Sequence, residues 1–274
     1  MHFIPLCQAM NQTSIQSAAQ QLLPAWTNIQ ALPSLDASHR PQNRAEGYSV
    51  QQALFEATQD STYGWKIAAT SQAGQKHIGV SGPLAGRLLN SRRLLPGAQV
   101  SLQGNLMRVM EAEFAFRMKR DVLRHDATPL STPEVMDAVE ALHLAIEIPN
   151  SRYTAFEHVG EASLIADFAC AGHVVIGPEV TAPWRELALD AHKVQVFKQG
   201  QWVADGVGAN VLGDPRLALT WLANELQDHG LCLRQGDTVI TGTCVVPVPV
   251  KEGDQMLADF GVLGQLAVAF TEDS

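Results

Sequence analysis

Every second side chain in residues 110–118 is apolar, and the side chains between them include two acids and an arginine. This pattern predicts a β-strand with two different faces. Successive side chains of a strand point to opposite sides, so Phe114 and Phe116 share an apolar face while Glu111 and Glu113 share the other. Two neighbouring carboxylates in an apolar strand are unfavourable, because each disfavours the charge of the other and burial disfavours both. A bound divalent cation removes that cost. The pattern leaves two interpretations open, a solvated acidic face or a metal site.

A second apolar segment carries a third acid. Residues 144–148 are apolar except for Glu147, and they predict another strand. An acid inside such a run is rarely buried without a partner. Glu147 therefore favours the metal site over the solvated face.

Lys66 lies within a further predicted strand, residues 63–69. A lysine on a strand edge commonly extends its ammonium group to water, so a functional role for Lys66 requires an anionic partner. Both interpretations stay open at this point.

Periodicity and turn signals predict the remaining elements. An amphipathic helix is expected from Ile15 to Trp26, followed by a loop over residues 34–46. Further helices are expected from a Ser49 cap to Ala57, from Thr70 or Ser71 to about His77, from Thr132 to about Leu142, and from Asp214 to about Gly230. Strands are expected at residues 98–102, 106–118, 238–243, 245–250, 256–260 and 265–270.

Composition narrows the class of protein. With 46% hydrophobic and 17% charged residues, the 274-residue chain has the make-up of an ordinary globular protein with a large core. The net charge is -9, and Arg92-Arg93 is only a short basic pair, so nucleic acid and anionic membranes are not expected partners. An anionic small substrate would need local help from a metal or from single cations.

Cysteine spacing and hydropathy predict the compartment. Cys7, Cys170, Cys232 and Cys244 are far apart and form no CxxC pair, which favours a reducing environment. The first residues lack the basic and apolar regions of a signal peptide, and no apolar run approaches the ~20 residues of a membrane span. We expect a soluble, cytoplasmic protein.

Several short motifs, weak singly but fairly specific in their order and spacing, resemble the fumarylacetoacetate hydrolase superfamily. The closer similarity is to its 2-oxo-4-pentenoate hydratase and 4-oxalocrotonate decarboxylase branch, and it covers most of the chain. The motifs are Gly64-Trp65-Lys66-Ile67 with Thr70-Ser71, Glu111-Ala112-Glu113-Phe114-Ala115-Phe116, Ile146-Glu147-Ile148 with Ser151-Arg152, Ile165-Ala166-Asp167, residues 219–226, Gly236-Asp237, Thr241-Gly242-Thr243 and Gly253-Asp254.

The resemblance implies an α+β fold. Its expected core is a mixed β-roll or β-sandwich with flanking helices, spanning residues 61–274, with a helical N-terminal region at residues 1–60. It also implies a homo-oligomer.

The resemblance further implies a set of site residues. An Mg2+ or Mn2+ ion would be held by residues matching Glu111, Glu113 and Glu147, and Lys66 would be the catalytic residue in the pocket. Hard divalent cations prefer carboxylate oxygens and can chelate the oxygens of a 2-oxo acid, which agrees with this assignment. Substrate contacts are implied at Asp167, Thr243 and Arg152.

The reaction that the resemblance favours is addition of water to a 2-oxo-4-enoate of the 2-hydroxypenta-2,4-dienoate type, as in aromatic catabolism. A 4-oxalocrotonate-type decarboxylase of the same branch is the alternative. An acylpyruvate C-C hydrolase would need a His-Glu dyad, for which His39 and Glu46 are the candidates, although their spacing does not match. A metal-binding relative without turnover is the fourth interpretation.

Two positions depart from the pattern of the branch. Hydratases of the branch commonly carry an acid after the proline where this chain has Pro83-Leu84-Ala85-Gly86, and its decarboxylases tend to lack that acid. An Asp-Asn pair is common where this chain has Asp167-Phe168. These departures leave the choice between hydration and decarboxylation open.

Overall fold

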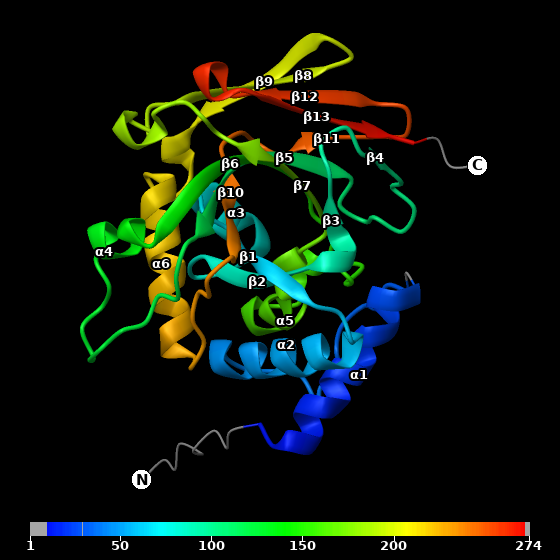
Figure 1. Cartoon of the computed structure of the whole chain (residues 1–274). Helices are drawn as coiled ribbons and strands as arrows, with labels where there is room; N and C mark the ends of the chain where they lie inside the picture. Colours follow the sequence, from blue (N-terminus) through cyan, green and yellow to red (C-terminus); the bar gives the residue numbers. More distant parts are fainter. Residues whose placement is uncertain (1–9, 29, 272–274) are drawn as a thin grey trace.

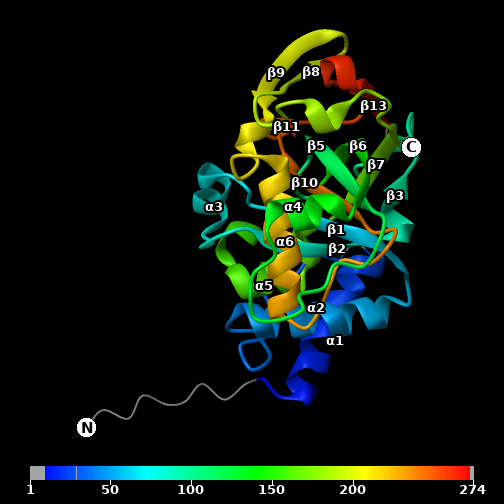
Figure 2. The same ribbon diagram turned by 60° about the vertical axis from the view of Figure 1, so that its left-hand side comes forward.

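The computed structural model describes residues 10–28 and 30–271 and contains two stacked β-sheets. Figure 1 shows three layers, with a five-stranded sheet at the top of the view, a curled eight-stranded sheet below it, and helices α1, α2 and α5 beneath. The turned view in Figure 2 keeps this order and shows α6 along the side of the curled sheet, where it contacts α4 and β10. This architecture confirms the α+β fold with a mixed sheet core and flanking helices.

The helices have the following bounds: α1 Gln12–Asn28, α2 Arg44–Thr58, α3 Gln72–Ile78, α4 Thr132–Asp137, α5 Glu161–Ala166 and α6 Pro215–Asp228. The curled sheet contains β1 Thr62–Ala68, β2 Leu84–Leu89, β3 Arg93–Leu94, β5 Val109–Met118, β6 Val139–Ile148, β7 His173–Glu179, β10 Thr238–Thr243 and β11 Val248–Pro249. The five-stranded sheet contains β4 Gln99–Val100, β8 Lys193–Lys198, β9 Gln201–Val207, β12 Gln255–Asp259 and β13 Gln265–Phe270.

Strands β5 and β6 occupy the middle of the curled sheet, whose order is β2-β1-β10-β5-β6-β7-β3, with β11 paired to β5. Most neighbours are antiparallel, but β1 runs parallel to β10 and β3 runs parallel to β7. Residues on β1, β10, β5 and β6 are therefore brought into adjacent rows although they are far apart along the chain.

The two faces of β5 have the two environments that their alternation predicts. Its apolar face, which includes Phe114 and Phe116, is fully buried in a cluster that also contains Val196 of β8 and Ala258 of β12, so it packs between the two sheets. Burial of such side chains is worth roughly 1.5–3 kcal/mol each and fixes which face of the strand points inward.

The opposite face of the curled sheet is covered by the N-terminal helices. A second hydrophobic cluster joins Leu22 and Trp26 of α1 and Leu54 of α2 to Ala115 and Ala145 of the sheet. These small alanines lie on the carboxylate-bearing face of β5 and β6, so α1 and α2 pack on the side of the sheet that carries the acids. The boundary at residue 60 stays a prediction, because α2 ends at Thr58 and β1 begins at Thr62 without separating this shared core.

Helix α2 begins earlier than the sequence predicts. Its N-cap is Asn43, whose side chain accepts the N–H of Glu46 at 3.0 Å, and the helix passes through Gly47 without a break. The predicted cap, Ser49, lies inside the helix and donates its hydroxyl to the carbonyl of Ala45. An asparagine cap offers an acceptor to the free N–H groups of the first turn, which explains the earlier start.

The predicted helix from Thr132 to about Leu142 is wrong in its second half. Helix α4 ends at Asp137, and β6 starts at Val139 and pairs with β5 along its length. Residues 139–142, predicted as helix, form strand because a long antiparallel ladder with a buried face outweighs local propensity.

The other predictions of secondary structure have mixed outcomes. The opening helix, the helix after Ser71, the helix capped by Asp214 and the four C-terminal strands are confirmed within a few residues. Strands β2, β3, β7, β8 and β9 have no counterpart among the predicted strands. Among the described residues, no helix is both long and apolar enough to cross a membrane.

Candidate active site

The three glutamates singled out in the sequence meet on one face of the curled sheet. Glu111 of β5 lies directly opposite Glu147 of β6 in the antiparallel register. Glu113, two residues along the same face, lies between Ala145 of β6 and Thr243 of β10. One carboxylate oxygen from each glutamate can be chosen so that the three oxygens lie within 4.8 Å of one another.

Two of these carboxylates are removed from solvent without being fully hydrogen-bonded. Glu113 and Glu147 have no exposed surface, while Glu111 is partly buried. Glu113 Oε2 accepts the backbone N–H of Gly242 at 2.6 Å. Glu113 Oε1 and Glu147 Oε2 accept no hydrogen bond from the described residues, and the only described donor near Glu147 Oε1 is the ammonium group of Lys66. Buried polar atoms of this kind cost free energy unless something binds them.

Lys66 supplies positive charge to the cluster. Its side chain is 2% exposed, and Nζ lies 2.9 Å from Oε1 of Glu147. Burial alone lowers the pKa of Lys66, but the carboxylates of Glu147, Glu111 and Glu113 outweigh this effect and raise it. The interpretation in which Lys66 extends to water is therefore wrong, and the ammonium group stays protonated within the site.

One ammonium group does not balance three carboxylates. Burial, followed by the charge of Glu147, raises the pKa of Glu111 to about 7. Burial and the charges of Glu147 and Glu111 raise the pKa of Glu113 well above its ordinary value. Oxygen-rich, negatively charged sites with unsatisfied lone pairs suit hard divalent cations, so the residues present fit the metal that the sequence predicts.

A bulge in β10 brings the backbone donor to Glu113. The register of β10 against β5 shifts between Ile240 and Thr243, and Gly242 in this stretch has a φ of 106°. A Cβ atom at Gly242 would lie 2.3 Å from Oγ1 of Thr70, so only glycine fits beside that buried threonine. The sequence signal for this donor is a glycine inside a strand pattern.

Thr243 lies next to the cluster, as its prediction as a substrate contact requires. It is the register partner of Glu113, and its hydroxyl donates to the carbonyl of Val245 at 2.7 Å. The hydroxyl oxygen keeps lone pairs for another donor. A substrate contact at Thr243 stays a prediction.

Arg152 and Asp167 form a separate buried pair. Asp167 Oδ1 accepts Nε–H of Arg152, and Oδ2 accepts the Arg152 backbone N–H at 3.0 Å and the Ser151 hydroxyl at 3.1 Å. The remaining donors of Arg152 bind two backbone carbonyls, of Ala171 and of Asp167, each at 2.7 Å. Both side chains are thus occupied by the protein itself, and their prediction as substrate contacts is not tested by this geometry.

The segment between these carbonyls is a tight left-handed turn. Phe168, Ala169 and Cys170 have φ angles of 49°, 50° and 60°, a conformation that costs non-glycine residues free energy. The turn rests on Gly86 of β2, where a Cβ atom would lie 1.8 Å from the Phe168 carbonyl oxygen. Gly86 is the register partner of Lys66, so Arg152 holds a turn that packs against the strand pair carrying the lysine. Sequence reasoning did not identify the role of Gly86.

The structure also places Leu84, Phe168 and Glu46, the residues on which the alternative functions depend. Leu84 and Phe168 are fully buried in hydrophobic clusters, Leu84 opposite Ala68 in the β1–β2 ladder. The carboxylate oxygens of Glu46 accept backbone N–H groups of Met10 at 3.2 Å and Gln42 at 2.7 Å. Glu46 therefore stabilises the start of α2, and the structure gives no support to its use in activating a water molecule.

Comparison with known proteins agrees with this geometry. Residues 90–271 match the family model described as fumarylacetoacetate (FAA) hydrolase C-terminal. The chain belongs to this family.

Similar proteins narrow the branch within the family. The chain is 30% identical over 263 residues to 2-hydroxyhexa-2,4-dienoate hydratase of Comamonas testosteroni, covering 94% of this chain and 98% of that enzyme. It is 36% identical over 211 residues to TodF product hydratase of Pseudomonas putida, covering 76% of each.

A solved structure shows the same fold over nearly the whole chain. The 4-oxalocrotonate decarboxylase from Pseudomonas putida G7, in complex with magnesium and adipate, matches with a TM-score of 0.86 and 26% identity, covering 95% of this chain and 98% of that one. The same enzyme has also been solved in complex with calcium and acetate. These likenesses support the predicted hydratase and decarboxylase branch.

Proposed function

We propose that this family member is a divalent-metal-dependent hydro-lyase that adds water to a 2-oxo-4-enoate of the 2-hydroxypenta-2,4-dienoate type. The observation that carries the proposal is the buried cluster of Glu111, Glu113 and Glu147, which has more negative charge than Lys66 balances and carboxylate oxygens without donors. The names of the similar hydratases support the reaction.

The three glutamates would hold the metal, Mg2+ or Mn2+. Such an ion supplies Lewis-acid stabilisation of negative charge on the oxygens of a bound 2-oxo acid. The backbone N–H of Gly242 keeps one oxygen of Glu113 fixed, which orients its other oxygen toward the centre of the cluster. That the magnesium-bound relative shares the fold supports a divalent cation at this place.

Lys66 is assigned the catalytic role. Its protonated Nζ lies in the cluster and can attract the carboxylate of an anionic substrate. Hydration also requires protons at carbon, and Nζ is the protonated group beside the carboxylates that can deliver one. For that second role the pKa of Lys66 must fall once substrate is bound.

The substrate contacts are proposed with different support. Thr243 lies beside Glu113 and has acceptor capacity left, which supports a direct contact. Arg152 and Asp167 have their groups engaged with each other and with the 168–170 turn, which supports an indirect effect on the site through that turn.

The function is tested by following 2-hydroxypenta-2,4-dienoate with the purified protein and Mg2+. We expect loss of the dienol absorbance without release of CO2, and loss of that activity on treatment with a chelator. Absence of turnover with this substrate and with other 2-oxo acids would instead support a metal-binding relative without catalysis.

Decarboxylation is the second candidate because two observations favour it. One similar solved structure is a decarboxylase, and Leu84 stands where hydratases of the branch commonly carry an acid. Release of CO2 from 4-oxalocrotonate, at a rate above hydration of the dienoate, would assign this reaction instead. Pyruvate release from an acylpyruvate would assign C-C hydrolysis.

We also propose a homo-oligomer acting on a small-molecule 2-oxo acid. The support is the family resemblance, and sedimentation of the purified chain at micromolar concentration measures the subunit number. A monomer at that concentration would contradict the proposal.

A further inference from the structure

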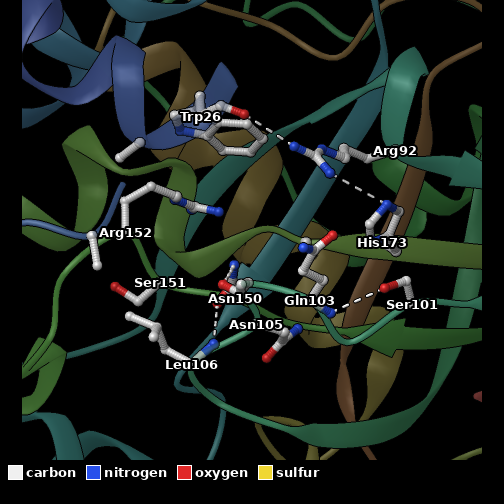
Figure 3. Close-up of a pocket in the computed structure, with 14 residues that line it drawn as sticks. Trp26, Arg92, Ser101, Gln103, Asn105, Leu106, Asn150, Ser151, Arg152 and His173 are labelled. Atoms are coloured by element: carbon white, nitrogen blue, oxygen red, sulfur yellow. Dashed lines mark hydrogen bonds between the residues drawn. The ribbon is translucent and has the colours of Figure 1, made fainter. Parts of the chain in front are cut away.

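A small cavity lies apart from the carboxylate cluster, beside the end of α1 (Figure 3). Its volume is about 90 Å³, and none of Glu111, Glu113, Glu147 and Lys66 lines it. Among the described residues, no aspartate or glutamate lines it either. The net charge of the chain is -9, yet this pocket is lined by two arginines and by no described acid. Such a lining favours an anionic ligand.

Arg92 is the arginine of this pocket whose guanidinium forms no direct salt bridge with the described residues, although the charge of Asp60 reaches it. Its guanidinium donates to the Trp26 carbonyl at 3.1 Å and lies 3.4 Å from Nε2 of His173, as Figure 3 shows. No carboxylate of the described residues pairs with Arg92 within 4 Å, although the group is partly buried. A guanidinium has five N–H donors, so several remain available to a ligand.

The other two ionisable side chains that line the pocket, Arg152 and His173, provide no negative charge for Arg92. Arg152 is neutralised by its bonds to Asp167. Burial and the charge of Arg92 lower the pKa of His173 to about 4, so this ring is neutral at physiological pH. Burial and the charge of Arg152 lower the pKa of Arg92, and the charge of Asp60, which forms no salt bridge with it, raises the pKa without reversing that shift.

Size and charge define the ligand that fits. The volume of about 90 Å³ is far below the roughly 300–1,000 Å³ of pockets for drug-sized ligands, so the occupant has few atoms. One guanidinium without a salt bridge, already opposed in part by the charge of Asp60, matches a monoanion better than a dianion. The planar fork of an arginine pairs with two oxygens of a carboxylate at once. Ala25, Ala31 and Leu106 supply apolar wall for a short hydrocarbon part.

We propose that this pocket is a second ligand site, separate from the metal cluster, which binds a small monocarboxylate of two or three carbons through Arg92. Trp26 and His173 hold the guanidinium in place, and the guanidinium of Arg152 lies over the Trp26 ring, 4.0 Å from its centroid. Because Arg152 also binds the carbonyls of Asp167 and Ala171, which flank the 168–170 turn, the site lies against the segment that packs beside Lys66.

Titration with acetate tests the proposal. Binding of carbon-13-labelled acetate to the full chain with Mg2+ is followed by NMR at constant ionic strength, in the wild type and in Arg92→Gln. Loss of a charge-assisted bidentate contact, worth roughly 1.5–3 kcal/mol, weakens affinity by about ten- to a hundredfold. Arg93→Gln is the matched control, because it removes the same charge from the next residue, which does not line the pocket. Its affinity should equal that of the wild type.

The variant Glu113→Gln distinguishes acetate bound in this pocket from acetate bound at the metal cluster. Acetate bound at the metal would be lost in Glu113→Gln and kept in Arg92→Gln, which would overturn the proposal. Acetate in the pocket gives the reverse pattern, whether or not the proposed hydratase activity exists. Tighter binding of inorganic phosphate than of acetate would overturn the assignment to a monocarboxylate.

A second variant covers the case in which Arg92→Gln does not fold. Ala31→Leu keeps every charge and fills part of the cavity. We expect it to weaken acetate binding, while circular dichroism shows a native fold. Unchanged acetate affinity in Ala31→Leu would contradict a site in this cavity.

Discussion

The cluster of Glu111, Glu113 and Glu147 and the pair of Arg152 with Asp167 are both buried, yet their charges are satisfied in opposite ways. In the pair, each carboxylate oxygen accepts a hydrogen bond from Arg152 or Ser151. In the cluster, three carboxylates face Lys66, and one oxygen each of Glu113 and Glu147, Oε1 and Oε2 respectively, has no donor among the described residues.

The difference separates a structural role from a ligand-binding role. A balanced, fully hydrogen-bonded buried pair holds its neighbours in place and needs no further partner. An unbalanced cluster is stable only if its acids take up protons or a cation binds. The energetic cost of leaving oxygens unsatisfied is therefore evidence for the metal. Four experiments test this difference between the cluster and the pair.

Glu113→Gln should have the largest effect. It removes a charge and a ligand oxygen while keeping an acceptor for Gly242, so we expect metal affinity to fall by more than ~100-fold and metal-dependent turnover to be lost. Calorimetric titration with Mg2+ measures the affinity, and the free energy of unfolding of the metal-free protein should not fall, because carboxylate repulsion is relieved. Glu140→Gln, at an exposed acid of the same sheet, is the control. Unchanged metal affinity in Glu113→Gln would refute its assignment as a ligand.

Lys66→Met should reduce turnover more than metal binding. Removing a group that transfers a proton or holds the substrate costs roughly 10²–10⁴-fold in rate. Steady-state kinetics at saturating Mg2+ gives the change in kcat, and titration shows whether metal affinity is kept. Lys119→Met, at an exposed lysine, should have wild-type activity. Normal turnover in Lys66→Met would leave Lys66 as a counter-charge only.

Arg152→Met should lower the free energy of unfolding more than it lowers substrate affinity. Removing one partner of a buried ion pair leaves Asp167 charged and unpaired, which costs about 3–5 kcal/mol of unfolding free energy. Urea denaturation measures this loss. Arg117→Met breaks surface pairs with Glu140 and Glu179 and should cost at most about 1 kcal/mol. A raised KM with wild-type stability would instead assign Arg152 to direct substrate binding.

Metal addition should have the smallest effect of the four. A metal ion that binds the folded chain and not the unfolded chain stabilises the fold by about 2.7 kcal/mol when its concentration is 100 times Kd. Thermal unfolding with and without Mg2+ or Mn2+ measures the shift, which should disappear in Glu113→Gln and persist in Glu140→Gln. An equal shift in both variants would place the metal elsewhere.

Much of the site follows from local pattern. The alternation in β5 determines that Glu111 and Glu113 share a face opposite Phe114 and Phe116, because side chains of a strand point to alternate sides. An acid in an apolar strand, as at Glu147, predicts a partner for the same local reason. The caps at Ser71 and Asp214 are likewise local, since a side-chain oxygen binds a backbone N–H a few residues away.

Other features depend on pairing between distant segments. Only the register of β5 with β6 places Glu111 opposite Glu147, and only the ladder from β1 through β10 brings Lys66 to the same cluster. Pairing also converts the residues after Asp137 from predicted helix to strand. The surroundings of Arg92 are likewise visible only in the fold, because the absence of an acid from the described lining of its pocket depends on which distant segments meet there. Sequence pattern fixes which face of an element a side chain occupies, whereas long-range packing decides which side chains meet.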